Sequence, residues 1–93
     1  MIQYTIQFEL QPDNENEFKL SWTSFYENIK EAEGLKTCKI SETGDNNYQI
    51  EMIWIEKYYL NLFMKGEWYN FLHGAINVLG NRSVITQRDV ESV

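Results

Sequence analysis

The sequence has little cysteine, proline and histidine, with one residue of each in 93. Cys38 cannot form a disulfide within the chain and has no CxxC companion, which disfavours a structural zinc site and indicates a reducing compartment. With no reactive motif around it, Cys38 is predicted to be a small buried hydrophobe and not a nucleophile. One histidine, without a second ligand at metal spacing, predicts no metal site.

Basic residues are also scarce, with 8 Lys and Arg against 14 Asp and Glu, for a formal charge of −6. Such a chain repels phosphate, so nucleic acid and anionic membrane are disfavoured as partners. The first residues alternate between apolar and polar and do not resemble a signal peptide, and no hydrophobic run is long enough to span a membrane. The sequence therefore predicts a cytoplasmic protein.

Aromatic residues are abundant, with three Trp, six Tyr and five Phe. We expect residues 1–93 to form one domain. The core of a domain of this size does not need so many large rings. Some of them are expected to line a pocket or an interface.

The pattern of apolar residues predicts four strands and two main helices. Alternation over 2–10 predicts a strand, and Pro12 ends it. A helix is expected over 14–33, with Asn14 as its cap, Glu17 completing a capping box and Gly34 as a left-handed C-terminal cap. Two strands, 35–43 and 48–55, should meet at a turn over 44–47. A short helix over 56–64, a longer one over 68–79, a strand over 83–87 and a polar tail over 88–93 follow.

The order β-α-β-β-α-β predicts an α+β, ferredoxin-like antiparallel sheet with helices on one face. On the other face we expect an apolar surface made of Cys38, Ile40, Ile53, Ile55 and Ile85. A surface of that kind usually marks an interface, which predicts a homodimer that packs sheet on sheet.

Several segments resemble the antibiotic biosynthesis monooxygenase family over nearly the whole chain. They are the acidic helix start over 12–18, the step Glu33-Gly34-Leu35, the strand that ends at Trp54, and the segment Lys65-Gly66-Glu67-Trp68-Tyr69-Asn70-Phe71-Leu72. The resemblance implies a dimeric α+β barrel and a cofactor-independent monooxygenase. Met52, Phe63 and Gly66 stand where the family often has Glu, His and Ser, so three polar positions are lost.

His73 and Tyr69 are the candidate catalytic residues, because His73 is the one side chain with an ordinary pKa near neutrality and Tyr69 lies one turn before it. The simpler reading of His73 is a surface histidine. A haem-degrading branch of the same family uses a histidine near this position, but Phe63 replaces its tryptophan, and Ile6 and Gln7 offer no asparagine. Haem degradation is therefore disfavoured, and no cofactor is expected.

A further set of aromatic residues is predicted to line an apolar cleft between the sheet and the helices, where a small apolar or aromatic molecule would bind. The set is Trp22, Tyr26, Trp54, Phe63 and Trp68, joined by Tyr69. Rings at helical spacing usually fill the core, which is the alternative. Two functions stay open: a monooxygenase acting on a quinol-like or polyketide-like aromatic, and a non-catalytic ligand-binding or regulatory homodimer.

Overall fold

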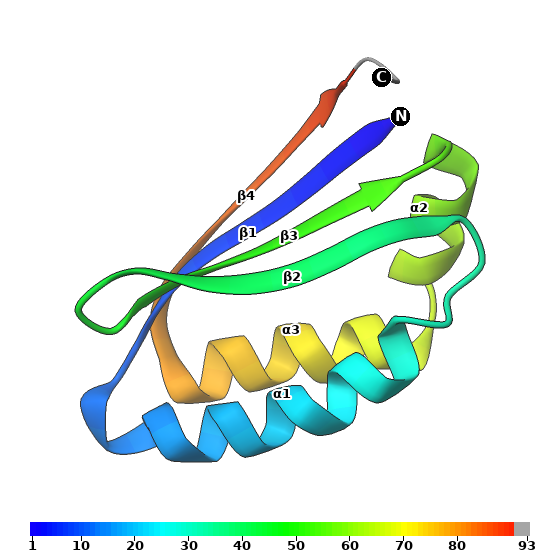
Figure 1. Cartoon of the computed structure of the whole chain (residues 1–93). Coiled ribbons are helices and arrows are strands. Elements are labelled where there is room, and N and C mark those ends of the chain that lie inside the picture. The colour runs from blue at the N-terminus through cyan, green and yellow to red at the C-terminus, as the bar shows by residue number, and fades with distance from the viewer. Residues whose placement is uncertain (91–93) are drawn as a thin grey trace.

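In the computed structural model, which describes residues 1–90, four strands form one antiparallel sheet in the order β2-β3-β1-β4. The strands are β1 (Ile2–Leu10), β2 (Leu35–Gly44), β3 (Asn47–Trp54) and β4 (Gly80–Asp89). The helices α1 (Glu15–Ile29) and α3 (Glu67–Leu79) cover one face of the sheet, and α2 (Lys57–Met64) lies near the place where β3 ends and β2 begins (Figure 1). The predicted α+β, ferredoxin-like antiparallel sheet with helices on one face is confirmed.

Alternation along β1 and β3 creates the core. Even-numbered residues of both strands face the helices and are buried, including Tyr4, Ile6, Ile50 and Trp54. The helices contribute the rest of the buried core, namely Phe18 and Ile29 from α1, Leu60 from α2, and Leu72, Ile76 and Leu79 from α3. Burial of these side chains is the main driving force for packing the helical layer on the sheet.

The prediction of an apolar surface on the other face of the sheet is wrong for three of its five residues. Cys38 pairs with Met52, and Ile40 pairs with Ile50. Ile85 pairs with Ile6 in the same way. Residues directly opposite one another point to the same face, and Met52, Ile50 and Ile6 face the helices.

The uncovered face of the sheet is mostly polar. A shallow hollow on it is lined by Gln3, Thr5, Gln7, Gln49, Glu51, Thr86 and Arg88. Side chains bond across the strands there, with 3.1 Å between Gln7 Nε2 and Gln49 Oε1 and 2.7 Å between Arg88 Nε and Gln3 Oε1. Ile53 lies on this face, and Ile55 follows β3 as a 43% exposed side chain.

Helix α1 is shorter than predicted and is not capped as predicted. It ends at Ile29 instead of residue 33, and a turn leads to Gly34, whose φ of +84° confirms the expected left-handed conformation. A 3-10 turn, Pro12–Asn14, precedes the helix, and no side chain caps it. The Asn14 amide donates to the Leu79 carbonyl oxygen at 3.2 Å, which ties the start of α1 to the end of α3.

Strand β4 extends beyond the predicted range 83–87 at both ends. It begins at Gly80, where α3 ends, so helix and strand are joined without a loop. A Cβ at position 80 would meet the carbonyl oxygens of Glu9 and Ile76 at 2.7 Å, so only glycine fits this junction. Of the polar tail expected over 88–93, Arg88 and Asp89 belong to β4, and residues 91–93 lie outside the described part of the chain.

Candidate functional site

A polar cluster begins where β1 passes beneath α3. The hydroxyl oxygens of Tyr4 and Tyr69 lie 2.7 Å apart, and their rings meet edge to face with centroids 6.2 Å apart. Tyr4 is buried because it belongs to the apolar face of β1, whereas Tyr69 is half-buried on the side of α3 that faces β4. A buried phenol needs a hydrogen-bond partner, and Tyr69 satisfies Tyr4.

His73 extends this cluster by one helical turn. Its ring stacks on the Tyr69 ring with centroids 5.6 Å apart and planes at 28°. Nδ1 of His73 lies 3.3 Å from Nδ2 of Asn77, one turn further along. An amide N–H donates, so Nδ1 accepts, and a neutral imidazole then carries its proton on Nε2. Tyr69, His73 and Asn77 thus share one stripe of α3, where Asn77 orients the imidazole.

This stripe faces the exposed strand β4. Ile85 and its neighbours at alternate positions, Ser83 and Gln87, lie opposite the buried residues of β1 and so point to the helix side of the sheet. Ile85 is 41% exposed, so the helices leave this part of β4 partly uncovered. A hollow of about 250 Å³ borders Asn77 and the start of β4. Of the polar stripe, Asn77 borders this hollow. We refer to the side of the molecule between α3 and β4 as the trough.

The surroundings of Tyr4 favour its uncharged phenol. Burial raises the pKa of Tyr4 well above its ordinary range, and the hydrogen bond with Tyr69 raises it further. Tyr4 is therefore a neutral hydrogen-bonding group at physiological pH and not a base. Within residues 1–90, no group of three or more His, Cys, Asp or Glu side chains is placed to hold a metal ion.

Two of the predicted pocket residues lie beside this cluster and fill space there. The Phe63 ring contacts Tyr69 with centroids 5.7 Å apart and Trp54 with centroids 5.1 Å apart. Trp54 is fully buried, and its indole N–H has no hydrogen-bond partner among the described residues. These two rings therefore pack against one another, and Phe63 packs against Tyr69 as well.

The other predicted pocket residues are in two further places. Trp68 lies between α1 and α3, with its ring centroid 6.5 Å from that of Phe25 and 5.5 Å from that of Phe71. Trp22 and Tyr26 lie on the other side of α1, next to β2, with their centroids 6.0 Å apart. The predicted pocket residues therefore do not line one common cleft.

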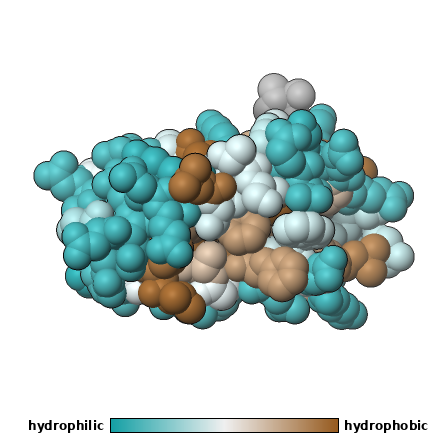
Figure 2. Space-filling view, turned by 90° about the horizontal axis from the view of Figure 1, so that it is seen from below, coloured by the Kyte–Doolittle hydropathy of each residue, from teal (hydrophilic) through white to brown (hydrophobic). Residues whose placement is uncertain are grey.

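The helix side of the molecule carries an apolar band. Hydrophobic side chains gather across its middle, with hydrophilic surface toward both ends (Figure 2). The most exposed large hydrophobic residues of α1 and α3 are Leu20 and Val78, each 76% exposed, and Phe71, 52% exposed.

Tyr4 is the member of the cluster that the sequence analysis missed. The sequence places it on the apolar face of a strand, 65 residues before its partner Tyr69. One chemical argument could have pointed to Tyr4. A tyrosine on the strand face that packs against helices requires a hydrogen-bond partner for its hydroxyl group.

A comparison with protein-family models and curated proteins finds no match for this sequence. Solved structures do match. A structure described as an antibiotic biosynthesis monooxygenase is 13% identical, with a TM-score of 0.86, over 99% of this chain and 100% of that one. A conserved protein from Methanosarcina mazei Go1 is 12% identical, with a TM-score of 0.89, over 97% of this chain and 92% of that one.

A variant of SnoaB, a cofactor-independent oxygenase from Streptomyces nogalater, also matches, with 12% identity and a TM-score of 0.82. The alignment covers 99% of this chain and 94% of that one. No helix within residues 1–90 has the length and apolar character needed to cross a membrane. The chain has the fold of proteins described as antibiotic biosynthesis monooxygenases.

Proposed function

We propose that this protein is a cofactor-independent monooxygenase that acts on a quinol-like or polyketide-like aromatic molecule in the trough between α3 and β4. The observation that carries the proposal is the line formed by Tyr4, Tyr69 and His73, with hydroxyl groups 2.7 Å apart and an imidazole stacked on the second ring. The likeness in fold to a cofactor-independent oxygenase supports it by analogy.

Tyr69 is the proposed hydrogen-bond donor to the oxygen atom of the substrate. Each phenol has one proton to donate, and Tyr4 is the more buried of the two. When Tyr4 donates to Tyr69, the Tyr69 proton is free to point into the trough. There it would donate to the developing oxyanion of a phenol or enol, which is the form of the substrate that reacts with oxygen.

His73 is the proposed proton acceptor. The Asn77 side-chain amide lies against Nδ1 of His73. If this amide rotates by half a turn, its oxygen atom faces Nδ1 and favours the tautomer that carries its proton on Nδ1. Nε2 is then free to accept a proton from the substrate. The substrate then loses a proton to His73 and an electron to oxygen. A ring CH₂ group plus O₂ gives a ring C=O group plus H₂O, so the substrate supplies all the electrons.

We also propose that the protein forms a homodimer. The two edge strands, β2 and β4, each have 10 residues and a free edge. Val84 and Ile85 of β4 are 55% and 41% exposed. Pairing of each β4 with the β2 of a second copy would cover both edges and close the two sheets into a barrel with the polar face inside.

The test is oxygen uptake with a panel of reduced quinols and anthrone-like compounds. We expect His73→Ala and Tyr69→Phe to lower kcat at least about tenfold, since general acid–base groups contribute about 10²–10⁴-fold. Phe71→Ala is the matched control, because Phe71 lies on the same helix but on its α1 side. Equal rates for all four proteins would refute the assigned roles.

The second candidate is a non-catalytic ligand-binding homodimer. The packing of Phe63 against Trp54 and Tyr69 favours it, because apolar rings occupy a wall that the related family often makes polar. Binding of several aromatic compounds without any oxygen uptake would support this candidate over the enzyme.

A further inference from the structure

The apolar band on the helix side of the molecule combines one residue of α1 with a stripe of α3 (Figure 2). Phe71, Gly74 and Val78 recur every three or four residues, so they share one face of α3. Leu20 follows the buried Phe18 by two residues, about 200° around α1, and therefore points away from the sheet. We define the apolar band as Leu20, Phe71, Gly74 and Val78.

The two helices lie side by side in opposite directions, which brings the members of the band together. The Asn14 amide bonds the Leu79 carbonyl oxygen at 3.2 Å, where α1 begins and α3 ends. Further along the pair, the ring centroids of Phe25 and Trp68 lie 6.5 Å apart. Leu20 is midway between these two contacts and therefore lies across from the middle of α3.

The middle of the band is a notch between large side chains. A Cβ at position 74 would have open space around it. Phe71, 52% exposed, and Val78, 76% exposed, lie one turn to either side, about 10 Å apart along the helix axis. Large apolar side chains that are this exposed and this close together mark an interaction surface. An amphipathic helix presents apolar side chains at the same spacing, so its length matches the band.

The charged side chains beside the band are acidic. Helix α3 contains Glu67, one turn before Phe71, and has no lysine or arginine. Lys65, which precedes it, belongs to the end of α2. On α1, Glu17 lies one turn before Leu20. Among residues 1–90, neither glutamate forms an ion pair.

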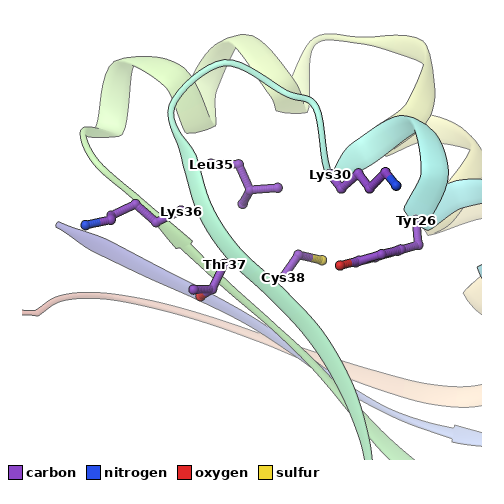
Figure 3. A pocket seen from close by; sticks show the side chains of 6 residues that line it. All are labelled: Tyr26, Lys30, Leu35, Lys36, Thr37 and Cys38. Carbon is purple, nitrogen blue, oxygen red and sulfur yellow. The ribbon is translucent and has the colours of Figure 1, made fainter.

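The lysines at α1 lie on its other side. Lys19 borders a hollow next to β2, and Lys30 lies next to Tyr26 on the side of α1 that borders β2 (Figure 3). Each ammonium group already lies 3.1 Å from a carboxylate oxygen, of Glu15 and of Glu27 respectively. With a formal charge of −6, a second copy would bring like charge against the band, as would an anionic membrane. The charges therefore favour a cationic partner.

We infer that the apolar band docks an amphipathic, basic helix of another protein. Apolar side chains of that helix contact the band, with a central one in the notch at Gly74. Its lysine or arginine side chains face Glu17 and Glu67, which adds charge complementarity to the apolar contact. His73 lies on another face of α3, so this surface does not depend on the proposed oxygenase reaction.

The probe is a peptide of about 18 leucine and lysine residues with its leucines at helical spacing, followed by amide NMR shifts at physiological ionic strength. We expect saturable shifts centred on Leu20, Gly74 and Val78. A peptide with glutamate in place of lysine, and a scrambled peptide without an apolar stripe, should each bind at least about tenfold more weakly. Equal binding of all three peptides, or shifts centred on the uncovered face of the sheet, would overturn the inference.

Variants locate the surface. Leu20→Lys and Val78→Lys should each weaken binding of the leucine–lysine peptide at least about tenfold, because each removes an apolar contact and adds a like charge. Leu62→Lys is the matched control, since Leu62 is a 48% exposed residue of α2, and it should leave binding unchanged. Amide spectra check the fold of each variant. Full binding by folded Leu20→Lys and Val78→Lys would refute the docking surface whatever the outcome for oxygen uptake.

Other occupants of the band would give different results. Association beyond a dimer in sedimentation velocity, abolished by Val78→Lys, would assign the band to a second copy. Binding to phosphatidylcholine vesicles, abolished by Leu20→Lys, would assign it to a membrane. Either result would overturn the assignment of a basic helix.

Discussion

The hydroxyl oxygen of Tyr4 lies 2.7 Å from that of Tyr69 and joins the first strand to the last helix. Removing one hydroxyl group breaks this bond, so Tyr4→Phe should lower the free energy of unfolding by about 1 kcal/mol. Urea denaturation measures the change. Tyr58→Phe is the control, because Tyr58 is 62% exposed and should tolerate the change.

The same pair can be tested for coupling. In a double-mutant cycle, Tyr4→Phe and Tyr69→Phe together should destabilise less than the sum of the single changes, because each single change already breaks the shared bond. Strict additivity would show that the two hydroxyl groups do not interact in solution.

Two glycines should respond in opposite ways to alanine. Gly34 has φ +84°, and a Cβ there would overlap the Tyr59 ring, so Gly34→Ala should destabilise by at least about 2 kcal/mol. Gly74 lies within α3 with open space around its missing Cβ, so Gly74→Ala should stabilise by about 0.5–1 kcal/mol. Thermal or urea unfolding of the matched pair tests both signs.

Glu15 should make stability depend on pH in the acid range. The hydrogen bond from the Tyr48 hydroxyl group, and then the Lys19 ammonium, hold the pKa of Glu15 below its ordinary value. Ionised Glu15 therefore stabilises the fold above the unfolded-state pKa of about 4.3, and this stabilisation is lost as the pH falls through the lower folded-state pKa.

The measurement is Tm from pH 7 to pH 2 for the wild type and for Glu15→Gln. We expect the wild type to be the more stable protein at pH 7 and the difference to shrink toward zero below about pH 4. A difference that stays constant over the whole range would contradict this assignment.

Cys38 should react slowly with alkylating reagents. The thiolate is the reactive form, and burial raises the pKa of this thiol to about 12. At pH 7.5 its iodoacetamide rate constant should be roughly a hundredfold or more below that of a free thiol. Urea-unfolded protein is the control and should react like a free thiol.

Dimer formation should depend on β4. Sedimentation velocity at micromolar concentration should give a dimer for the wild type and for Leu20→Lys, which changes an exposed residue of α1. Val84→Lys, at the centre of the exposed strand β4, should give a monomer. A monomeric wild type would remove the homodimer from the proposed function.

The sequence predicts the element order well because the two periodicities are clear. Polar and apolar residues alternate over β1, and the stripe Trp68, Leu72, Ile76 and Leu79 marks α3. The fold class follows from these elements. The end of α1 could not be placed, because residues 30–33 have helix-compatible composition but form a turn.

The face of the sheet to which each side chain of β2 points could not be predicted, because it depends on one shift in the pairing of β2 with β3. Gly44 of β2 pairs with Asn47 of β3 next to the turn. If the pairing continued from there without a shift, Cys38 would lie opposite Ile53 and would point to the uncovered face of the sheet. A shift of register between Glu42 and Gly44 instead places Cys38 opposite Met52. A slip of one residue reverses every side chain of a strand, and composition does not reveal it.

The candidate site was predicted in part for a similar reason. Helical spacing correctly puts Tyr69 and His73 on one stripe of α3. It cannot say which neighbour a ring meets, so Trp22 and Trp68, expected in one cleft, lie on opposite sides of α1. The bond from Tyr4 to Tyr69 depends on how the layers pack, which no local pattern records.

At Gly80, β4 follows α3 directly, with no loop residue between the helix and the strand. A loop would let the helix rotate while the strand stayed in place, but here the last residue of one element is followed directly by the first residue of the other. The trough can therefore widen only if α3 bends or β4 shifts in its pairing with β1. Under the proposed function, a bulky substrate beside His73 would strain the edge of the sheet, which would limit the size of the substrate.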